Sequence, residues 1–259
     1  MCPRPAPLSE HPIRWTKSCG LRFEHQVALH LTAVFQPIVC LRRDEVFAYE
    51  VLARWHEGSP ESFLQSAVAQ GCMGRLGRAI RLLATDAGRG HRLFLNIHPA
   101  ELVSRWVVRP DDPMNSYDGE IYLEITEASA MEHFELCRSA LREIGDRTGA
   151  RLVVDDFGAG YSNMVRIVDL EPSVVKLDKS LVAGLPQDRR RQIVVRHLVG
   201  MCEDLGAKVV AEGVETEDER RVVVDCGVHY GQGWLFGRPK PRVPPHSPSS
   251  VRRSRPAGG

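Results

Sequence analysis

The chain has 259 residues, of which 43% are hydrophobic and 26% charged, and its formal net charge is +1. These proportions are typical of a folded globular protein, and the near-zero charge gives no support for general DNA binding. No apolar run approaches the ~20 residues that span a bilayer, and the first residues lack the apolar core of a secretory signal. The seven cysteines are scattered and include no CxxC pair, which argues against a disulfide framework or a structural zinc site. We therefore expect a cytoplasmic protein with reduced thiols and no membrane association.

Short apolar runs rich in Val, Ile, Leu and Phe recur along the chain, with amphipathic stretches between most of them. The runs are 33–39, 46–55, 92–97, 121–126, 151–156, 173–178 and 208–214, with a further candidate near 230–236. The amphipathic stretches have helical spacing and include 62–87, 133–149 and 189–207, of which the last two end at Gly149 and near Gly206. Alternation of strand and helix predicts a parallel sheet covered by helices, and this number of strands favours a closed barrel.

The first two predicted strands, 33–39 and 46–55, are separated only by CLRRDE, which is too short for a crossover helix. They should form a hairpin, so the fold class that we expect is α/β, a (β/α)8 TIM-like barrel with one antiparallel strand. We expect residues 1–24 to be a flexible leader, 25–240 to be the folded domain, and 241–259, which are rich in Pro, Ser and Arg, to be a disordered tail.

Polar residues follow the predicted strands one after another, where a barrel collects its chemistry. They are Glu50, Asn96, Glu124, Asp155, Asp156, Lys176, Glu212 and Gln232. Carboxylates that converge on one barrel mouth need a compensating cation, because unpaired like charges are costly to crowd together. The oxygen donors are hard ligands without His or Cys, which favours Mg²⁺ or Mn²⁺ over zinc or copper.

The segment RLVVDDFGAGYS, residues 151–162, places two carboxylates side by side at the end of a predicted strand. Neighbouring strand residues point to opposite faces, so Asp155 and Asp156 can serve two ions only if the chain bends there. Gly158 and Gly160 permit such a bend. Two ions a few ångströms apart are the usual apparatus of phosphoester hydrolysis, although a plain polar turn before FGAG is the alternative interpretation.

Eight stretches in order resemble the EAL domain, the bacterial phosphodiesterase domain for cyclic di-GMP. They are FQPIV (35–39), YEVLARW (49–55), LNIHP (95–99), LEITE (123–127), DDFGAGYS (155–162), KLDKS (176–180), AEGVET (211–216) and GQGWLFGRP (231–239). The resemblance runs from Phe35 to Pro239 and implies that residues 25–240 form an EAL phosphodiesterase domain.

The resemblance implies which residues hold metal. Glu50, Asn96, Glu124 and Asp155 match the family's ligands of a first ion, and Asp155 and Asp156 match residues at a second. Two ions, Mg²⁺ or Mn²⁺, are thus expected as cofactors.

The resemblance also implies the catalytic and substrate-binding residues. Lys176 matches the lysine that places and polarises the attacking water, and Glu212 matches a general base or second-site ligand, so these two join Glu50 as catalytic residues. Arg54 matches the arginine that holds a substrate phosphate, a role that suits its forked guanidinium, and Gln232 lines the site.

Glu127 and Glu215 match glutamates that anchor the loop carrying DDFG. The sequence departs from the family at Val51, where Ala is usual, at Ala159, where Thr is usual, and at Asn163, where Ser is usual. We expect little effect from Val51. Loss of the threonine hydroxyl at 159 should weaken activity or alter regulation without abolishing it, because one hydrogen bond contributes on the order of 1 kcal/mol.

The expected function is therefore that of a cyclic-guanylate-specific phosphodiesterase that opens cyclic di-GMP to linear pGpG. Two alternatives stay open at this point: a catalytically silent cyclic di-GMP receptor that regulates a partner protein, and a regulator that binds no nucleotide. Regulation is expected through homodimerisation, a separate protein or expression level. The candidate dimer surface is Asn163–Pro172, whose apolar residues could equally pack a helix on the barrel.

Overall fold

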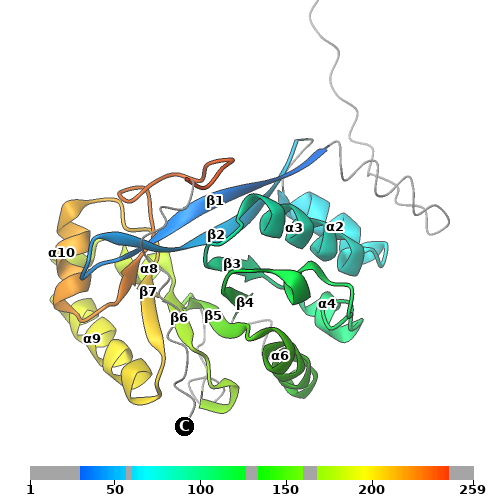
Figure 1. The fold of residues 1–259 in the computed structure, drawn as a ribbon. Coiled ribbons are helices and arrows are strands. Elements are labelled where there is room, and N and C mark those ends of the chain that lie inside the picture. Colours follow the sequence, from blue (N-terminus) through cyan, green and yellow to red (C-terminus); the bar gives the residue numbers. More distant parts are fainter. Residues whose placement is uncertain (1–29, 57–59, 127–133, 160–167, 245–259) are drawn as a thin grey trace, which may run out of the picture.

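The computed structural model describes residues 30–56, 60–126, 134–159 and 168–244. Its strands hydrogen-bond in sequence order and close into a barrel (Figure 1). The strands are β1 (Leu31–Cys40), β2 (Glu45–Trp55), β3 (Leu93–Asn96), β4 (Ile121–Thr126), β5 (Arg151–Phe157), β6 (Val174–Leu177), β7 (Lys208–Ala211) and β8 (Tyr230–Gly231). The predicted runs all contribute strands, including the candidate eighth.

Strand β1 is antiparallel to both of its neighbours, β2 and β8, whereas the other neighbouring pairs are parallel. The hairpin β1–β2 is paired from Leu31↔Trp55 to Cys40↔Glu45. Because β8 is short, the segment after it continues the seam, with Phe35 and Lys240 exchanging backbone hydrogen bonds of 2.7 and 2.9 Å. The predicted TIM-like barrel with one antiparallel strand is thus confirmed.

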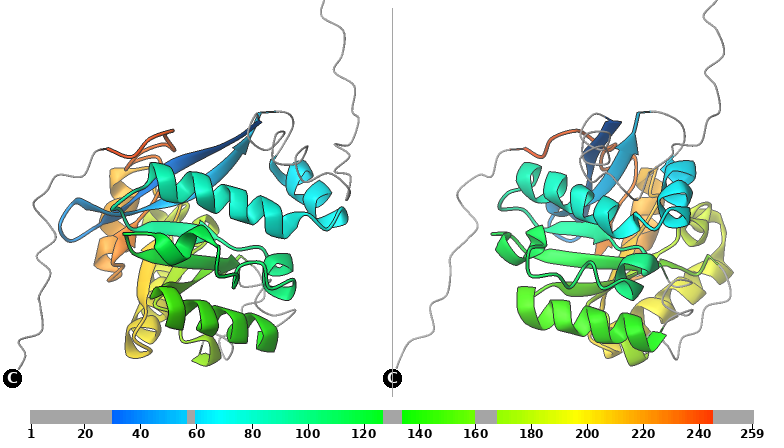
Figure 2. Two further views of the ribbon diagram at one scale, coloured as in Figure 1. Left: turned by 45° about the vertical axis from the view of Figure 1, so that its right-hand side comes forward. Right: turned by 90° about the vertical axis from the view of Figure 1, so that its right-hand side faces the viewer.

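Helices lie around the outside of the strands (Figure 2). The α-helices are α2 (Pro60–Ala69), α3 (Met73–Ala87), α4 (Pro99–Val103), α6 (Phe134–Thr148), α8 (Lys179–Val182), α9 (Arg189–Asp204) and α10 (Glu217–Asp225), and the 3₁₀ helices are η1 (Pro113–Ser116) and η2 (Leu185–Gln187). The stretch 62–87 is two helices rather than one, because Gly71 takes a left-handed φ of 65° and breaks the helical path between α2 and α3. Left-handed glycines also follow α6 and α9, at Gly149 and Gly206, as expected.

The barrel interior is filled by one side chain from nearly every strand. This cluster comprises Ile38, Ala48, Phe94, Tyr122, Val153, Val174 and Val210. Strand residues alternate between the two faces of a sheet, so the residue two positions further along each parallel strand also points inward. In β2, β3, β4, β5 and β6 that residue is Glu50, Asn96, Glu124, Asp155 and Lys176. Strand alternation therefore places a ring of polar side chains directly above the apolar core.

Some expectations about the chain ends lie outside the described residues, including the whole leader 1–24 and the tail from 245 onward. At the start of the predicted tail, Val243 packs against the core and the Pro244 carbonyl lies 3.0 Å from Nε2 of His91. Across the described ranges, no helix combines the length and apolarity needed to cross a bilayer. Cys40, Cys72, Cys202 and Cys226 are buried free thiols.

Candidate functional site

The Lys176 ammonium lies at the centre of the polar ring and is 1% exposed. It contacts four carboxylates, at distances of 2.6 Å from Glu212, 2.9 Å from Glu124, 3.2 Å from Asp155 and 3.5 Å from Glu50. These side chains come from β2, β4, β5, β6 and the residue after β7. The barrel therefore gathers them from across the chain, as the pattern of strand ends predicted.

Two amide side chains orient the Glu50 carboxylate. Asn96 Nδ2 donates to Glu50 Oε1 at 3.2 Å and to Glu124 Oε2 at 3.0 Å. Gln232 Nε2 donates to the other Glu50 oxygen and, at 3.4 Å, to Oε1 of Gln36. The amide hydrogens are thus turned toward the protein, and the Asn96 carbonyl oxygen takes no part in these hydrogen bonds.

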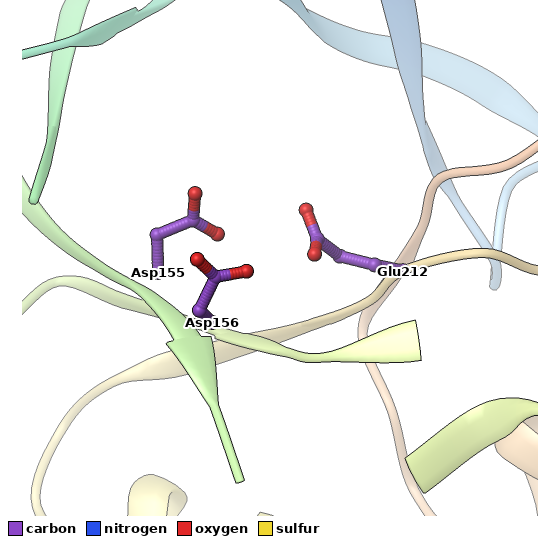
Figure 3. Close-up of side chains that lie close together, drawn as sticks. All are labelled: Asp155, Asp156 and Glu212. Carbon is purple, nitrogen blue, oxygen red and sulfur yellow. The ribbon is translucent and has the colours of Figure 1, made fainter. Parts of the chain in front are cut away.

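Asp155 and Asp156 do not obey the alternation of a regular strand. The β5–β6 pairing shifts register between Val154 and Phe157, and Asp156 has a φ of 56°, in the left-handed region that Asp tolerates better than most residues. Both carboxylates consequently point to the same space, and Figure 3 shows them facing Glu212. One ligand atom from each of these three residues lies within 4.8 Å of the others. The expected bend exists, but it begins at Asp156 itself, ahead of Gly158.

Charge is strongly unbalanced at this site. Five carboxylates, those of Glu50, Glu124, Asp155, Asp156 and Glu212, surround one ammonium. Burial raises the pKa of Glu124 well above its ordinary value and raises the pKa of Glu212 to about 7. Burial and the neighbouring Asp155 also raise the pKa of Asp156. Excess negative charge is therefore relieved by protons unless a further cation is present.

Glu50 and Lys176 respond differently from the other groups. Burial acts to raise the pKa of Glu50, but Lys176 and the Gln232 and Asn96 amides outweigh it, so that pKa is lowered. Burial acts to lower the pKa of Lys176, but the surrounding carboxylates, with Glu124 first, raise it well above its ordinary value. This lysine is therefore an ammonium, and Glu50 is a carboxylate.

The donor set fits hard divalent cations. The candidate ligands are carboxylate and amide oxygens, and such oxygens bind Mg²⁺, Mn²⁺ or Ca²⁺ rather than zinc or copper. In addition, Gln232 Oε1 is a buried acceptor without a hydrogen-bond partner. This oxygen receives no hydrogen bond from the protein and is therefore available to a bound ion, water or ligand.

Two other predicted site residues, Arg54 and Glu215, are partly or fully exposed. Arg54 is partly exposed on β2, and its Nη1 donates to the Ala53 carbonyl at 3.1 Å. Glu215 is exposed, and its backbone N–H donates to Glu219 at 2.9 Å. Glu127 and Asn163 lie outside the described residues. The structure thus gathers the strand-end residues but leaves the proposed anchoring of the DDFG loop untested.

Gln36 belongs to the site although its role was not anticipated. It pairs with Glu50 in the β1–β2 register, accepts from Gln232, and donates from Nε2 to the Gly237 carbonyl at 3.3 Å. The signal was present in FQPIV, because Gln36 lies two residues from Ile38 of the interior cluster. In the parallel strands the polar residue follows the core residue by two positions. Strand β1 runs in the opposite direction, so its polar residue, Gln36, precedes its core residue, Ile38.

Comparison with known proteins agrees with this geometry. Residues 23–239 match the family model of the EAL domain, so the chain belongs to the EAL domain family. Over 232 residues it is 31% identical to cyclic di-GMP phosphodiesterase RocR of Pseudomonas aeruginosa, which covers 81% of this chain and 57% of RocR. Over 226 residues it is 33% identical to the Escherichia coli protein named probable cyclic di-GMP phosphodiesterase PdeB, which covers 80% of this chain and 42% of PdeB. The chain spans about half the length of these curated relatives.

A solved structure shows the same fold with a ligand bound. The chain is similar to Klebsiella pneumoniae BlrP1 in its manganese and cy-diGMP complex, with a TM-score of 0.69 and 29% identity. The match covers 81% of this chain and 56% of that chain. A calcium and cy-diGMP complex of BlrP1 matches equally well, with a TM-score of 0.69.

Proposed function

We propose that this protein is a metal-dependent phosphodiesterase that hydrolyses cyclic di-GMP to linear pGpG. The observation that carries the proposal is the excess of five carboxylates over one ammonium, with Asp155 and Asp156 turned to the same side. Five crowded carboxylates cannot all ionise beside one ammonium at low cost, so the site favours the binding of further cations. The phosphodiesterase names of RocR and PdeB and the cy-diGMP complexes of BlrP1 support the choice of substrate.

In this proposal two Mg²⁺ or Mn²⁺ ions are the cofactors, and they supply Lewis acidity and a nucleophilic water at neutral pH. Glu50, Asn96, Glu124 and Asp155 would hold one ion, and Asp155 and Asp156 would hold the other. The hydrogen bonds from Asn96 and Gln232 keep the Glu50 carboxylate oriented and ionised.

The remaining residues act on the proton and on the phosphate. Glu212 accepts a proton from the attacking water, and its pKa of about 7 in the metal-free protein suits a general base at neutral pH. Lys176 holds positive charge beside the phosphorus centre, where negative charge increases during the reaction. Arg54 at the barrel mouth presents a fork that binds a substrate phosphate through two parallel hydrogen bonds.

We further propose that the protein acts in the cytoplasm and forms a homodimer through Asn163–Pro172. Residues 168–172 of that segment are described, and Val168 is 52% exposed. Leu170 of the same segment is buried in the core, so the segment packs on the barrel and leaves Val168 available to a partner subunit.

The test is incubation of the purified protein with cyclic di-GMP and Mn²⁺ or Mg²⁺, followed by chromatographic separation of nucleotides. We expect pGpG to form, and to disappear with EDTA or in Glu50→Ala. A matched control is Glu45→Ala, which removes an exposed glutamate from the opposite end of β2. Binding of cyclic di-GMP without turnover would favour a receptor, and absence of binding would leave a regulator that acts without nucleotide.

A further inference from the structure

A second group of buried charges lies outside the barrel, between α3, α4 and η1. It consists of Arg81, Glu101 and Asp112, each at most 2% exposed. Arg81 Nη1 donates to Glu101 Oε2 at 2.6 Å, and Arg81 Nη2 donates to Asp112 Oδ2 at 2.8 Å. Arg81 Nε also donates to both Asp112 oxygens, at 3.0 and 3.2 Å. The guanidinium is therefore held by carboxylates from two different segments.

This ion cluster is connected to the strand end that carries Asn96. Glu101 Oε1 accepts a hydrogen bond from the His98 backbone N–H at 3.3 Å, and His98 Nδ1 accepts from the Ala100 N–H at 3.1 Å. The two bonds form a capping box at the start of α4. His98 is two residues after Asn96, and the intervening Ile97 N–H donates to the Glu124 carbonyl at 2.9 Å. The backbone that leaves Asn96 is thus held on one side by β4 and on the other by Glu101.

Helix α3 packs so closely against Glu101 that a side chain is excluded there. A Cβ placed on Gly77 would lie 1.8 Å from Glu101 Oε2 and 2.2 Å from its carboxyl carbon. Gly77 is within the helix, where glycine is unfavourable by roughly 0.5–1 kcal/mol relative to alanine. Glycine is nevertheless present at position 77, because any larger residue there would overlap the Glu101 carboxylate.

Stability alone is a weak explanation of this cluster. Burying three charged groups is expensive, and replacement of a buried ion cluster by apolar side chains is often neutral or stabilising. A buried ion cluster does fix the orientation of its side chains. Here the two oxygens of Glu101 accept from different donors, Oε2 from Arg81 and Oε1 from the His98 N–H. Rotation of this carboxylate would release either Arg81 or His98.

We propose that Arg81 is a positioning residue which, through Glu101, holds the turn at residues 96–98 and thereby aims the Asn96 carboxamide at the metal site. The inference rests on the proposed function, because it takes Asn96 to be a metal ligand. In this inference the buried cluster of Arg81, Glu101 and Asp112 contacts neither metal nor substrate, yet it determines the orientation of one metal ligand, Asn96. Its readouts therefore have to report on Asn96 and on metal binding rather than on turnover alone.

The experiment compares Gly77→Ala, Glu101→Leu, Arg81→Met and the double variant Arg81→Met/Glu101→Leu with the wild type. The first readout is the side-chain amide resonance of Asn96 in a ¹⁵N correlation spectrum of the metal-free protein, identified by its loss in Asn96→Asp. The second is the Mn²⁺ dissociation constant, measured from free Mn²⁺ by electron paramagnetic resonance. Val195→Ala, a core truncation in α9 on a different part of the barrel, is the control for general loss of stability.

We expect the Asn96 resonance to shift and Mn²⁺ affinity to fall about tenfold in the single variants, the usual scale for residues that orient metal ligands. Because Arg81 acts through Glu101, the double variant should lose no more affinity than Glu101→Leu. Val195→Ala should lower the melting temperature and change neither readout. Gly77→Ala and Glu101→Leu remain informative if Arg81→Met fails to fold.

The inference is overturned if the variants lower the melting temperature as the control does but leave the Asn96 resonance and Mn²⁺ affinity unchanged. It is also overturned if the effects of Arg81→Met and Glu101→Leu simply add. Failure of the proposed function is a separate result, since it would appear as a wild-type protein that does not hydrolyse cyclic di-GMP. The amide resonance reports on Asn96 in either case.

Discussion

The ammonium nitrogen of Lys176 lies 2.6 Å from Oε1 of Glu212, at the end of the neighbouring strand. The same nitrogen reaches Glu50, Glu124 and Asp155, so one lysine provides the positive charge for most of the site. A second cation that enters this site must share these carboxylates with Lys176. Lys176 and a bound metal ion therefore compete for the same carboxylates, and this competition can be measured.

Removal of the lysine charge should make folding depend on metal. In Lys176→Met the buried carboxylates lose their partner, and breaking a buried ion pair from one side costs about 3–5 kcal/mol. We expect thermal unfolding in EDTA to shift to a markedly lower temperature, and Mn²⁺ to restore more stability to this variant than to the wild type.

The control for this prediction is Lys208→Met, which removes an exposed lysine at the opposite end of β7 from Glu212. Its melting temperature should respond to Mn²⁺ as that of the wild type does. If Lys176→Met is as stable as the wild type in EDTA, the lysine is not the resident counter-charge.

Glu212 should make the metal-free protein less stable as the pH rises. Its pKa is raised by burial from 4.5 to about 7, so between these values the folded state holds a proton that the unfolded state has released. Stability from this group is complete below pH 4.5 and is lost as the pH passes 7. At about 1.4 kcal/mol per pKa unit, the shift corresponds to on the order of 3 kcal/mol.

The measurement is denaturant unfolding in EDTA at pH 5 and pH 8 for the wild type and Glu212→Gln. The wild type should lose stability relative to the variant between these pH values, and saturating Mn²⁺ should reduce the difference. Parallel pH dependence of the two proteins would contradict the prediction.

The left-handed backbone at Asp156 should make two substitutions that both remove the carboxylate differ in stability. Asp156→Asn keeps a side chain that tolerates the φ of 56°, whereas Asp156→Val places a β-branched residue there. We expect Asp156→Val to be less stable than Asp156→Asn by about 1–2 kcal/mol in chemical denaturation. Both should bind Mn²⁺ more weakly than the wild type, because both lose a carboxylate. Equal stability of the two variants would show that the left-handed conformation carries no strain.

Ala159 is the departure from the family pattern that can be tested by restoring the usual residue. Its N–H donates to the Asp156 carbonyl at 3.2 Å, so it belongs to the same turn. If a hydroxyl contributes a hydrogen bond on the order of 1 kcal/mol, Ala159→Thr should raise kcat/KM for cyclic di-GMP about fivefold. Ala159→Val has the same shape without the hydroxyl and should show no gain. A gain in both variants would assign the effect to packing.

The fold was largely predictable because it depends on local pattern. Apolar runs bounded by polar residues and alternating with helical stretches indicated a barrel, and the short link CLRRDE indicated the antiparallel β1. The break at Gly71 was missed because residues 62–87 keep an amphipathic pattern across it, and only the left-handed φ of Gly71 shows that two helices result.

The site was predictable where strand alternation controls direction. Glu50, Asn96, Glu124, Asp155 and Lys176 each lie two residues after a side chain of the interior cluster, so their convergence follows from period two once the barrel is assumed. Gln36 follows the same rule in reverse order along β1. Glu127 and Glu215 were assigned by resemblance alone, and their assignment stays a prediction.

The sequence by itself determined the barrel and the sequence positions of the polar residues at its mouth, because hydrophobic periodicity dictates which side chains face inward. Only the tertiary structure decided which individual contacts those groups make. The register shift in β5 turns Asp156 beside Asp155, the closed sheet brings Lys176 against carboxylates from both halves of the chain, and the packing of α3 on α4 joins Arg81 to Glu101. Such contacts depend on backbone geometry and on residues distant in sequence, which a local pattern does not encode.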